Sequence, residues 1–220
     1  MEQPDSPVHR YHDGTKHHFD RFARSLGYLD WDTQPRPFRS FAGSHSYPLY
    51  PAPDAGNDGY APVAVDYSQL YEPAQPRTPI SAGALGDLLR HSLGLSAWKA
   101  FGSSRWSLRV NPSSGNLHPT EAYLVAGPEC GFSDAAGVYH YAPDRHALEE
   151  RCAFLPGPWR AAWGDTPGFL VALTSIHWRE AWKYGERAFR YCQHDAGHAI
   201  ATVSLAVAGL GWKATLLDDL

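Results

Sequence analysis

The chain has 220 residues, of which 43% are hydrophobic and 19% are charged, and its formal net charge at pH 7 is −4. This composition is typical of a globular protein, and the length allows one large domain or two small ones. The weak negative charge argues against non-specific nucleic-acid binding. No segment approaches the roughly 18 apolar residues of a membrane span, and the first residues lack an apolar signal region. We therefore expect a cytoplasmic protein that binds neither nucleic acid nor membrane.

Side-chain composition adds two expectations. Three cysteines, Cys130, Cys152 and Cys192, cannot form a disulfide framework, which fits a reducing compartment. The sequence also has 8 Trp, 12 Tyr, 18 Pro and 20 Gly. Large flat side chains on rigid loops suit a flat aromatic ligand, and they fit an ordinary packed core equally well.

Residues 1–79 are predicted to form an extended, wrapping arm, because prolines interrupt every long helical pattern there. Within this arm, Thr15–Leu26 could form one helix with Phe19 and Phe22 on a common stripe. The same region is rich in histidine, which can bind metal, but no cysteine or carboxylate stands at ligand spacing, so a solvated polar stretch is favoured. These histidines are His12, His17 and His18.

Regular structure is predicted from residue 80 onward. Ser81 can cap a helix with leucines at helical spacing, and Gly94 can end it. Three strands follow, at residues 122–126, 138–141 and 169–173, and the uniformly apolar third strand should be covered on both faces. The leucines of the helix are Leu85, Leu88, Leu89 and Leu93.

The last third of the sequence predicts one long helix over Trp178–Ala208, ended by the turn Gly209–Leu210–Gly211. A strand over Trp212–Leu217 should follow. Together with the preceding elements, this pattern predicts an α+β fold with helices packed on a sheet. The expected buried stripe of the helix is Phe189, Cys192, Ala196, Ile200, Val203 and Val207.

The polar segment Asn111–Pro119, called the signature loop below, is the strongest candidate for a binding site. Its prolines fix the backbone and Gly115 permits close approach, so its small polar groups could read the edge of a heteroaromatic ring. The alternative is a loop whose hydroxyls only satisfy its own backbone. The residues that could contact such a ring are Pro112, Ser113, Ser114 and Asn116.

Arg105, Ser107 and Arg109 alternate just before the signature loop. In an extended segment they point to one side, where two guanidinium groups and a hydroxyl suit a phosphate monoester. Alternate arginines are also common on an exposed strand face.

Two further candidates lie in the predicted long helix. Lys183 stands next to Tyr184, and such a pair could transfer a proton, although a solvated stripe of charges is the ordinary interpretation. His194 and His198 are one helical turn apart and could share a metal ion, but packed histidines are favoured because Asp195 replaces the usual glutamate between them.

Taken in order, these segments resemble the flavin-dependent nitroreductase family, specifically its SagB-like, azoline-dehydrogenase-like branch. The resemblance covers residues 80–217. It rests on Arg109–Tyr123, Gly137–Glu149, Lys183–Tyr191, His194–His198 and Gly209–Gly211.

The resemblance implies a nitroreductase-like three-layer sandwich, in which helices flank a central antiparallel sheet. It also implies FMN bound between the subunits of a homodimer, or of a pseudo-dimer with a second nitroreductase-like half. NAD(P)H is a candidate electron donor, and the substrate would be a small molecule or a peptide. The protein's share of such chemistry is to position the flavin and to stabilise charge on it.

The family's site residues can be carried over to this sequence. The signature-loop residues Pro112, Ser113, Ser114 and Asn116 correspond to flavin contacts, and the turn Gly209–Leu210–Gly211 corresponds to a region near the ring. Arg109 corresponds to an arginine on the cofactor side, with Arg105 and Ser107 completing a phosphate pattern. Lys183 and Tyr184 correspond to the pair that removes a substrate proton.

Two departures from the family pattern shape the final expectation. The phosphate pattern stands after the first family helix instead of before it, and the domain at 80–220 is expected to lack the family's C-terminal segment. The sequence thus predicts an FMN-dependent oxidoreductase, either nitroreductase-like or azoline dehydrogenase-like. The alternatives are a degenerate, non-catalytic scaffold or partner-binding domain, and a metal hydrolase using His194 and His198.

Overall fold

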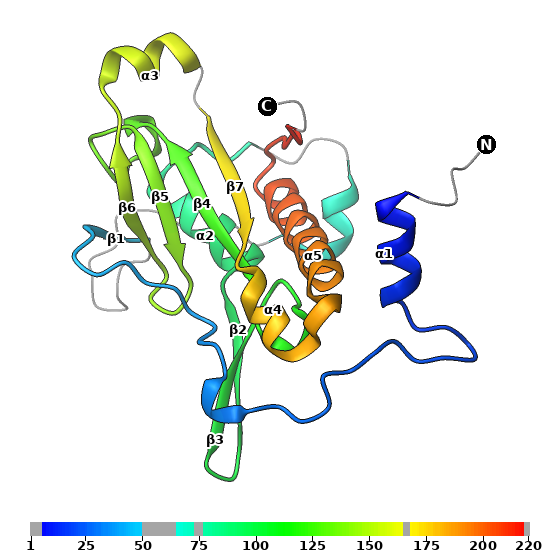
Figure 1. Cartoon of the computed structure of the whole chain (residues 1–220). Helices are drawn as coiled ribbons and strands as arrows, with labels where there is room; N and C mark the ends of the chain where they lie inside the picture. The colour runs from blue at the N-terminus through cyan, green and yellow to red at the C-terminus, as the bar shows by residue number, and fades with distance from the viewer. Residues whose placement is uncertain (1–5, 50–64, 73–76, 165–167, 218–220) are drawn as a thin grey trace.

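A five-stranded antiparallel sheet forms the centre of the protein (Figure 1). The computed structural model describes residues 6–49, 65–72, 77–164 and 168–217. The strands pair in the order β1-β6-β5-β4-β7, so β1 and β7 are the edges. A separate two-stranded hairpin, β2–β3, projects from the sheet. The strands are β1 (Ser46–Pro48), β2 (Leu95–Phe101), β3 (Ser104–Arg109), β4 (Thr120–Ala126), β5 (Gly137–Ala142), β6 (Ala147–Ala153) and β7 (Phe169–Ser175).

Helices flank this sheet, which confirms the predicted α+β fold with a central antiparallel sheet. The core lies between the sheet, α2 and the C-terminal part of α5. The α-helices are α1 (Pro7–Thr15), α2 (Ala82–Ser92), α3 (Pro156–Trp163), α4 (His177–Tyr184) and α5 (Ala188–Gly209). Short 3₁₀ helices are η1 (Trp31–Thr33), η2 (Tyr67–Tyr71), η3 (Ser114–Asn116), η4 (Pro128–Cys130) and η5 (Gly185–Arg187).

Helix α2 forms as its sequence predicts. The Ser81 hydroxyl accepts a hydrogen bond from the Ala84 amide at 3.2 Å, and Leu85, Leu88 and Leu89 are buried in the core. The chain then enters β2 only three residues after the helix ends, and the strands of the β2–β3 hairpin are not among those that the sequence predicted. Local capping and spacing were therefore sufficient for this helix, but not for the strand that follows.

The N-terminal part differs from its prediction. The helix expected at Thr15–Leu26 is wrong, because α1 begins at Pro7, where the Ser6 side chain caps the His9 amide. Phe19 and Phe22 are 114% and 85% exposed, so their spacing reflects no core-facing stripe. In Figure 1 this segment runs past α5, α4 and the hairpin to the sheet edge. The division into an arm at 1–79 and a domain at 80–220 stays a prediction.

The predicted long helix is also wrong, because it is broken between α4 and α5. Gly185 has φ +55°, a left-handed conformation that suits glycine, and it turns the chain between the two helices. The predicted stripe is confirmed at Cys192 and Val207, which are buried, but it is wrong at Phe189 and Ile200, which are 54% and 42% exposed. The predicted end at Gly209–Gly211 is confirmed. The residues of α5 that are buried are Ala188, Cys192, Asp195, Ala199 and Val207.

The strand predictions are mixed. Residues 122–126 and 138–141 lie in β4 and β5, as predicted, and β5 pairs with β6 as the expected hairpin. Residues 169–173 also form a strand, but β7 is a half-exposed edge, so the expected coverage of both faces is wrong. Residues 212–217 form no strand, because Trp212 instead anchors this segment to the Thr78 carbonyl through its indole N–H at 2.6 Å.

The second face of the sheet carries a buried row of charged groups. His140 on β5 is fully buried and contacts Glu121 on β4 and Glu149 on β6, each with a nitrogen-to-oxygen distance of 2.8 Å. Arg179 of α4 donates to Glu121, and Arg145 donates to Glu149, both at 2.6 Å. Because side chains alternate along strands, the apolar core occupies the opposite face.

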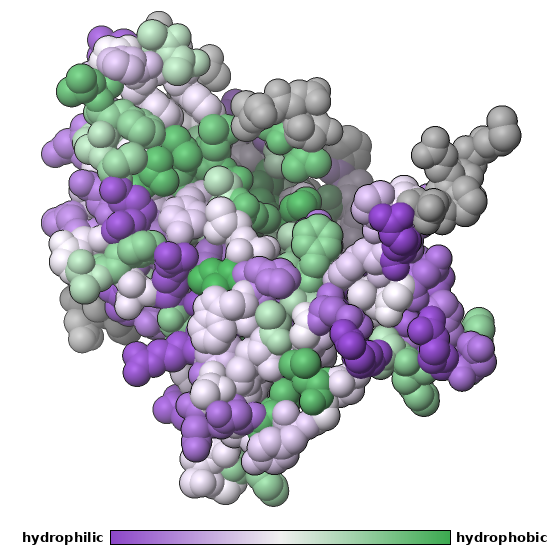
Figure 2. All heavy atoms as spheres, in the orientation of Figure 1, coloured by the Kyte–Doolittle hydropathy of each residue, from purple (hydrophilic) through white to green (hydrophobic). Residues whose placement is uncertain are grey.

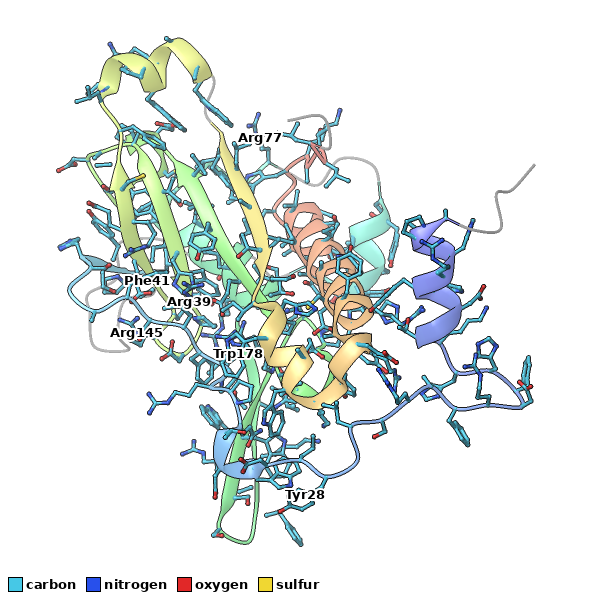
Figure 3. All side chains as sticks on the ribbon, viewed as in Figure 1. Tyr28, Arg39, Phe41, Arg77, Arg145 and Trp178 are labelled. Atoms are coloured by element: carbon cyan, nitrogen blue, oxygen red, sulfur yellow. The ribbon has the colours of Figure 1, made fainter. Side chains whose placement is uncertain are left out.

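Phe41 covers this charged row from outside. Its ring meets His140 edge to face at 5.1 Å, and its amide donates to Glu149 at 3.1 Å. Figure 3 shows Phe41 beside Arg39 and Arg145, near the ends of β5 and β6. The N-terminal segment therefore shields the charges from solvent and strengthens their mutual attraction.

The two carboxyl groups of the charged row share His140 as a hydrogen-bond partner. Both ring nitrogens contact a carboxylate, and a neutral imidazole has only one N–H to donate. Burial acts to raise the pKa values of Glu121 and Glu149, but the contacts with His140 and the arginines outweigh it and hold both below the usual value. Both carboxyl groups are therefore ionised at neutral pH, and each lies against one ring nitrogen of His140.

Replacing His140 by leucine should destabilise the protein by roughly 3–5 kcal/mol, because it leaves two carboxylates buried without their shared partner. Urea denaturation measures the free energy of unfolding. The control is His177→Gln, which changes an exposed histidine at the start of α4. Equal stability of the two variants would show that the charged row does not hold the sheet.

Candidate functional site

The signature loop lies between β3 and β4 and is held mainly by its own side chains. The Ser113 hydroxyl accepts from the His118 amide at 2.8 Å, and the Asn116 amide donates to the Ser107 carbonyl at 2.9 Å. Three residues have left-handed φ angles: Gly115 (63°), Asn116 (60°) and His118 (49°). The hydroxyl and amide groups predicted to read a ring thus first fix the shape of the loop.

His118 stays neutral within this loop. Burial, together with the charges of Arg109 and Arg179, lowers the pKa of His118 to about 3. Its Nε2 lies 2.8 Å from the Asn116 side-chain oxygen, and its carbonyl accepts from Arg179 at 2.6 Å. Arg179 therefore joins the loop to the charged row on the sheet, because the same Nη1 nitrogen also donates to Glu121.

Asp195 of α5 anchors the signature loop at Ser114. Its carboxylate accepts from the Ser114 amide at 3.0 Å and from the Ser114 hydroxyl at 3.2 Å. Asp195 is fully buried. A buried carboxylate requires such donors, so this contact fixes the position of the loop against the long helix.

The structure brings Lys183 and Tyr184 directly against the loop. A Cβ atom placed on Gly115 would lie 2.6 Å from the Tyr184 hydroxyl oxygen and 3.0 Å from Lys183 Nζ. Gly115 is therefore required here both by its φ angle and by this close approach. Helix α4 ends at Tyr184 and the chain turns at Gly185, and this break allows Tyr184 to contact the loop.

Beneath this pair lies Glu180, a carboxyl group that the sequence suggested only as a surface charge. It is fully buried, and neither of its oxygens has a hydrogen-bond partner within the described ranges. Burial raises the pKa of Glu180 to about 8, and the nearby Asp195 acts in the same direction. The two neighbouring carboxyl groups thus differ in their surroundings: Asp195 accepts hydrogen bonds from Ser114, whereas Glu180 keeps its proton at neutral pH.

The predicted phosphate pattern is not an open cradle. Arg105, Ser107 and Arg109 do lie on β3 as predicted, but Arg105 is exposed, with its Cζ 4.3 Å from the Trp98 ring centroid. Arg109 is buried and donates to the carbonyls of Thr120 and Pro37, at 3.3 and 2.5 Å. Burial lowers the pKa of Arg109 to about 10, which leaves it charged at neutral pH.

Two other predicted groups lie away from the loop. Gly209, Leu210 and Gly211 lie at the C-terminal end of α5. At 1.5 Å per residue, Gly209 is about 21 Å from Asp195 along the helix axis. His194 and His198 are exposed on the outer face of α5. Within the described ranges, no group of three or more His, Cys, Asp or Glu side chains could hold a metal ion.

Sequence reasoning missed Asp195 and Glu180 as site residues. A signal for Asp195 existed, because it stands at spacings of three and four between the buried residues Cys192 and Ala199. A carboxylate on a buried stripe needs a partner, and the signature loop supplies it. Glu180 had no such signal, since its burial depends on where α4 packs.

The geometry can be compared with known proteins. A solved structure from Anabaena variabilis, described as a candidate nitroreductase, superposes with a TM-score of 0.64 and 24% identity over 90% of this chain. The fold is nitroreductase-like. Over 141 residues, 61% of this chain, the sequence is also 26% identical to MJ1384 of Methanocaldococcus jannaschii, named as a candidate nitroreductase. No family model matches the sequence.

The extent of these matches is limited. This chain with its nitroreductase-like fold spans 37% of the Anabaena chain and 66% of the M. jannaschii protein. The E. coli microcin synthetase McbBCD complex, solved with truncated pro-MccB17 bound, matches 68% of this chain and 61% of its own, with 23% identity and a TM-score of 0.46. Both the Anabaena and the M. jannaschii proteins are named as candidate nitroreductases, and the property that this chain is shown to share with them is the fold. None of the helices in the described part combines the length and apolar character of a membrane span.

Gly115→Ala should destabilise the protein by roughly 1–3 kcal/mol, because the new methyl group meets the Tyr184 hydroxyl and alanine disfavours a φ of 63°. Chemical denaturation measures this loss. Gly157→Ala in α3 is the control, since no atom lies near its added Cβ. The expected close packing would be refuted by equal effects at both positions.

Glu180→Gln should flatten the pH dependence of stability. Between pH 5 and 8 the native carboxyl keeps a proton that the unfolded chain releases, so the free energy of unfolding falls as pH rises through this window. The loss is on the order of 5 kcal/mol when ionisation is complete. Urea titrations from pH 5 to 8.5 test this, with the exposed Glu186→Gln as control. Parallel curves for wild type and Glu180→Gln would contradict it.

Proposed function

We propose that this chain is an FMN-dependent oxidoreductase that transfers two electrons, in the manner of a nitroreductase or a peptide azoline dehydrogenase. One observation carries the proposal: on a nitroreductase-like fold, Lys183 and Tyr184 lie directly against Gly115 of the signature loop. These two elements are far apart in the sequence, and the family resemblance predicts that both belong to one site.

The residues present fit the ring of FMN better than its phosphate. Gly115 is exposed at the crest of the loop, and a cationic amine and a phenol hydroxyl border it. Such donors suit the polar edge of a flavin ring. Of the three residues expected at the phosphate, only Arg105 presents an exposed side chain, because Ser107 and Arg109 are buried. The ring would therefore lie along Pro112–Asn116.

When bound, FMN would supply the two-electron acceptor. The residues of this chain would transfer the proton and position the reacting group. In azoline dehydrogenation, Lys183 Nζ in its uncharged form would accept the proton that leaves a substrate carbon, and the Tyr184 hydroxyl would orient the reacting group. Burial and the nearby Glu180 raise the pKa of Tyr184, so it would act as a hydrogen-bond donor. A substrate that only accepts electrons would need the same two groups as proton donors.

We further propose that a second subunit or half completes the site. Phe189, Ile200 and Leu205 on α5 are 54%, 42% and 39% exposed, which is unusual for large apolar side chains. The match to 37% of the Anabaena chain is compatible with a pseudo-dimer, and a homodimer would cover the same surface. The engaged state of Arg109 favours one alternative, a non-catalytic scaffold of the same fold.

The absorbance spectrum of the purified protein tests this proposal. We expect flavin bands and release of FMN on denaturation. Lys183→Met should keep the flavin but lower the rate of proton-coupled turnover at least tenfold, because it removes the base without changing the loop. Lys99→Met, on the exposed hairpin, is the control. A colourless protein that gains no flavin from added FMN would favour the scaffold.

A further inference from the structure

Arg187 lies in the turn between α4 and α5, and no described acidic side chain forms an ion pair with it. Its Cζ lies 5.9 Å from the Tyr184 ring centroid and 5.0 Å from that of Tyr191, and it donates to the Tyr191 hydroxyl. None of the ion pairs within the described ranges includes Arg187. Its Nε is buried with no partner in the same ranges. Arginine in such surroundings is suited to binding a planar oxyanion.

The neighbouring His17 strengthens this interpretation. Its Nδ1 accepts a hydrogen bond from the Ala23 amide at 3.1 Å, which places the ring proton on Nε2. That nitrogen lies 3.0 Å from Arg187 Nη2, and a guanidinium can only donate. Two donors therefore face each other. An acceptor bound beside them would take a hydrogen bond from both and remove the mismatch.

The charge around Tyr184 is positive overall. Lys183 Nζ lies 5.6 Å from the Tyr184 ring centroid, close to the corresponding distance for Arg187. The Asp195 carboxyl group accepts hydrogen bonds from Ser114, and Glu186 pairs with Arg24 at 2.5 Å. Figure 2 shows hydrophilic side chains over α1 and the chain that follows it, which pack beside this turn.

We propose that Arg187 and His17 form an oxyanion subsite that binds a carboxylate or phosphate group of a ligand lying against Tyr184. The ligand's identity rests on the proposed function. Tyr184 reaches Gly115 with its hydroxyl and neighbours Arg187 with its ring, so one ligand can extend from the loop to the subsite. The oxyanion is either the phosphate of FMN or a carboxylate of the substrate.

Inorganic phosphate is the first probe, because its binding needs no flavin and no turnover. Ligand binding to the native state raises the melting temperature with concentration. We expect phosphate to stabilise wild type and the control Arg24→Gln equally. Arg187→Gln should bind phosphate at least tenfold more weakly, and His17→Phe about threefold more weakly. Equal shifts in all four proteins, or no shift in any up to about 50 mM, would overturn the subsite.

The source of the oxyanion is identified with the flavin-loaded protein. If Arg187 binds the cofactor phosphate, Arg187→Gln should reduce the preference for FMN over riboflavin at least tenfold. If it binds a substrate carboxylate, that preference should persist while the KM for 4-nitrobenzoate rises relative to nitrobenzene. Changes below twofold in both ratios would refute the proposal. Absence of flavin binding in wild type would instead refute the proposed function and leave the phosphate measurement to decide the subsite.

Discussion

The buried contact between Arg179 and Glu121 is the interaction on which the arrangement of the site depends. Glu121 belongs to a charged row with His140 and Glu149 that joins β4, β5 and β6. Arg179 extends the row to α4 and, through the His118 carbonyl, to the signature loop. Buried charges tolerate little displacement, because each needs its partners in place. The same sheet therefore holds in position both the signature loop and helix α4, which carries Lys183 and Tyr184.

The site itself is built from groups of opposite electrostatic character. Asp195 takes donors from Ser114 and holds the loop, whereas Glu180 has no donor and stays protonated. Lys183 precedes Tyr184 in the sequence and Arg187 follows it, and together they leave a local excess of positive charge. This combination suits a ligand with a flat polar ring and an anionic group. The hydroxyl groups of Ser113 and Ser114 contact protein groups, so not every hydroxyl of the signature loop needs to face a ligand.

The elements that the sequence predicted correctly have strong local signals. Helix α2 has a serine cap and leucines at helical spacing, and β4 and β5 have apolar runs between turn residues. The failures have physical causes that local patterns do not contain. Gly185 breaks a continuous helical pattern because the chain must turn there, and Trp212 leaves a strand-like segment to bond the Thr78 carbonyl. Tertiary contacts outweigh local propensity at both positions.

The sequence by itself determined the α+β fold class, because cap residues, periodicity and motif order are local properties. It also singled out the signature loop and the Lys183–Tyr184 pair, whose functional roles stay predictions. Only the tertiary structure decided that this pair meets Gly115, that Asp195 holds the loop and that Arg109 is engaged by backbone carbonyls. It also decided the protonation of Glu180. Burial and the position of neighbouring charges set the state of a titratable group, and neither exists until the helices have packed on the sheet.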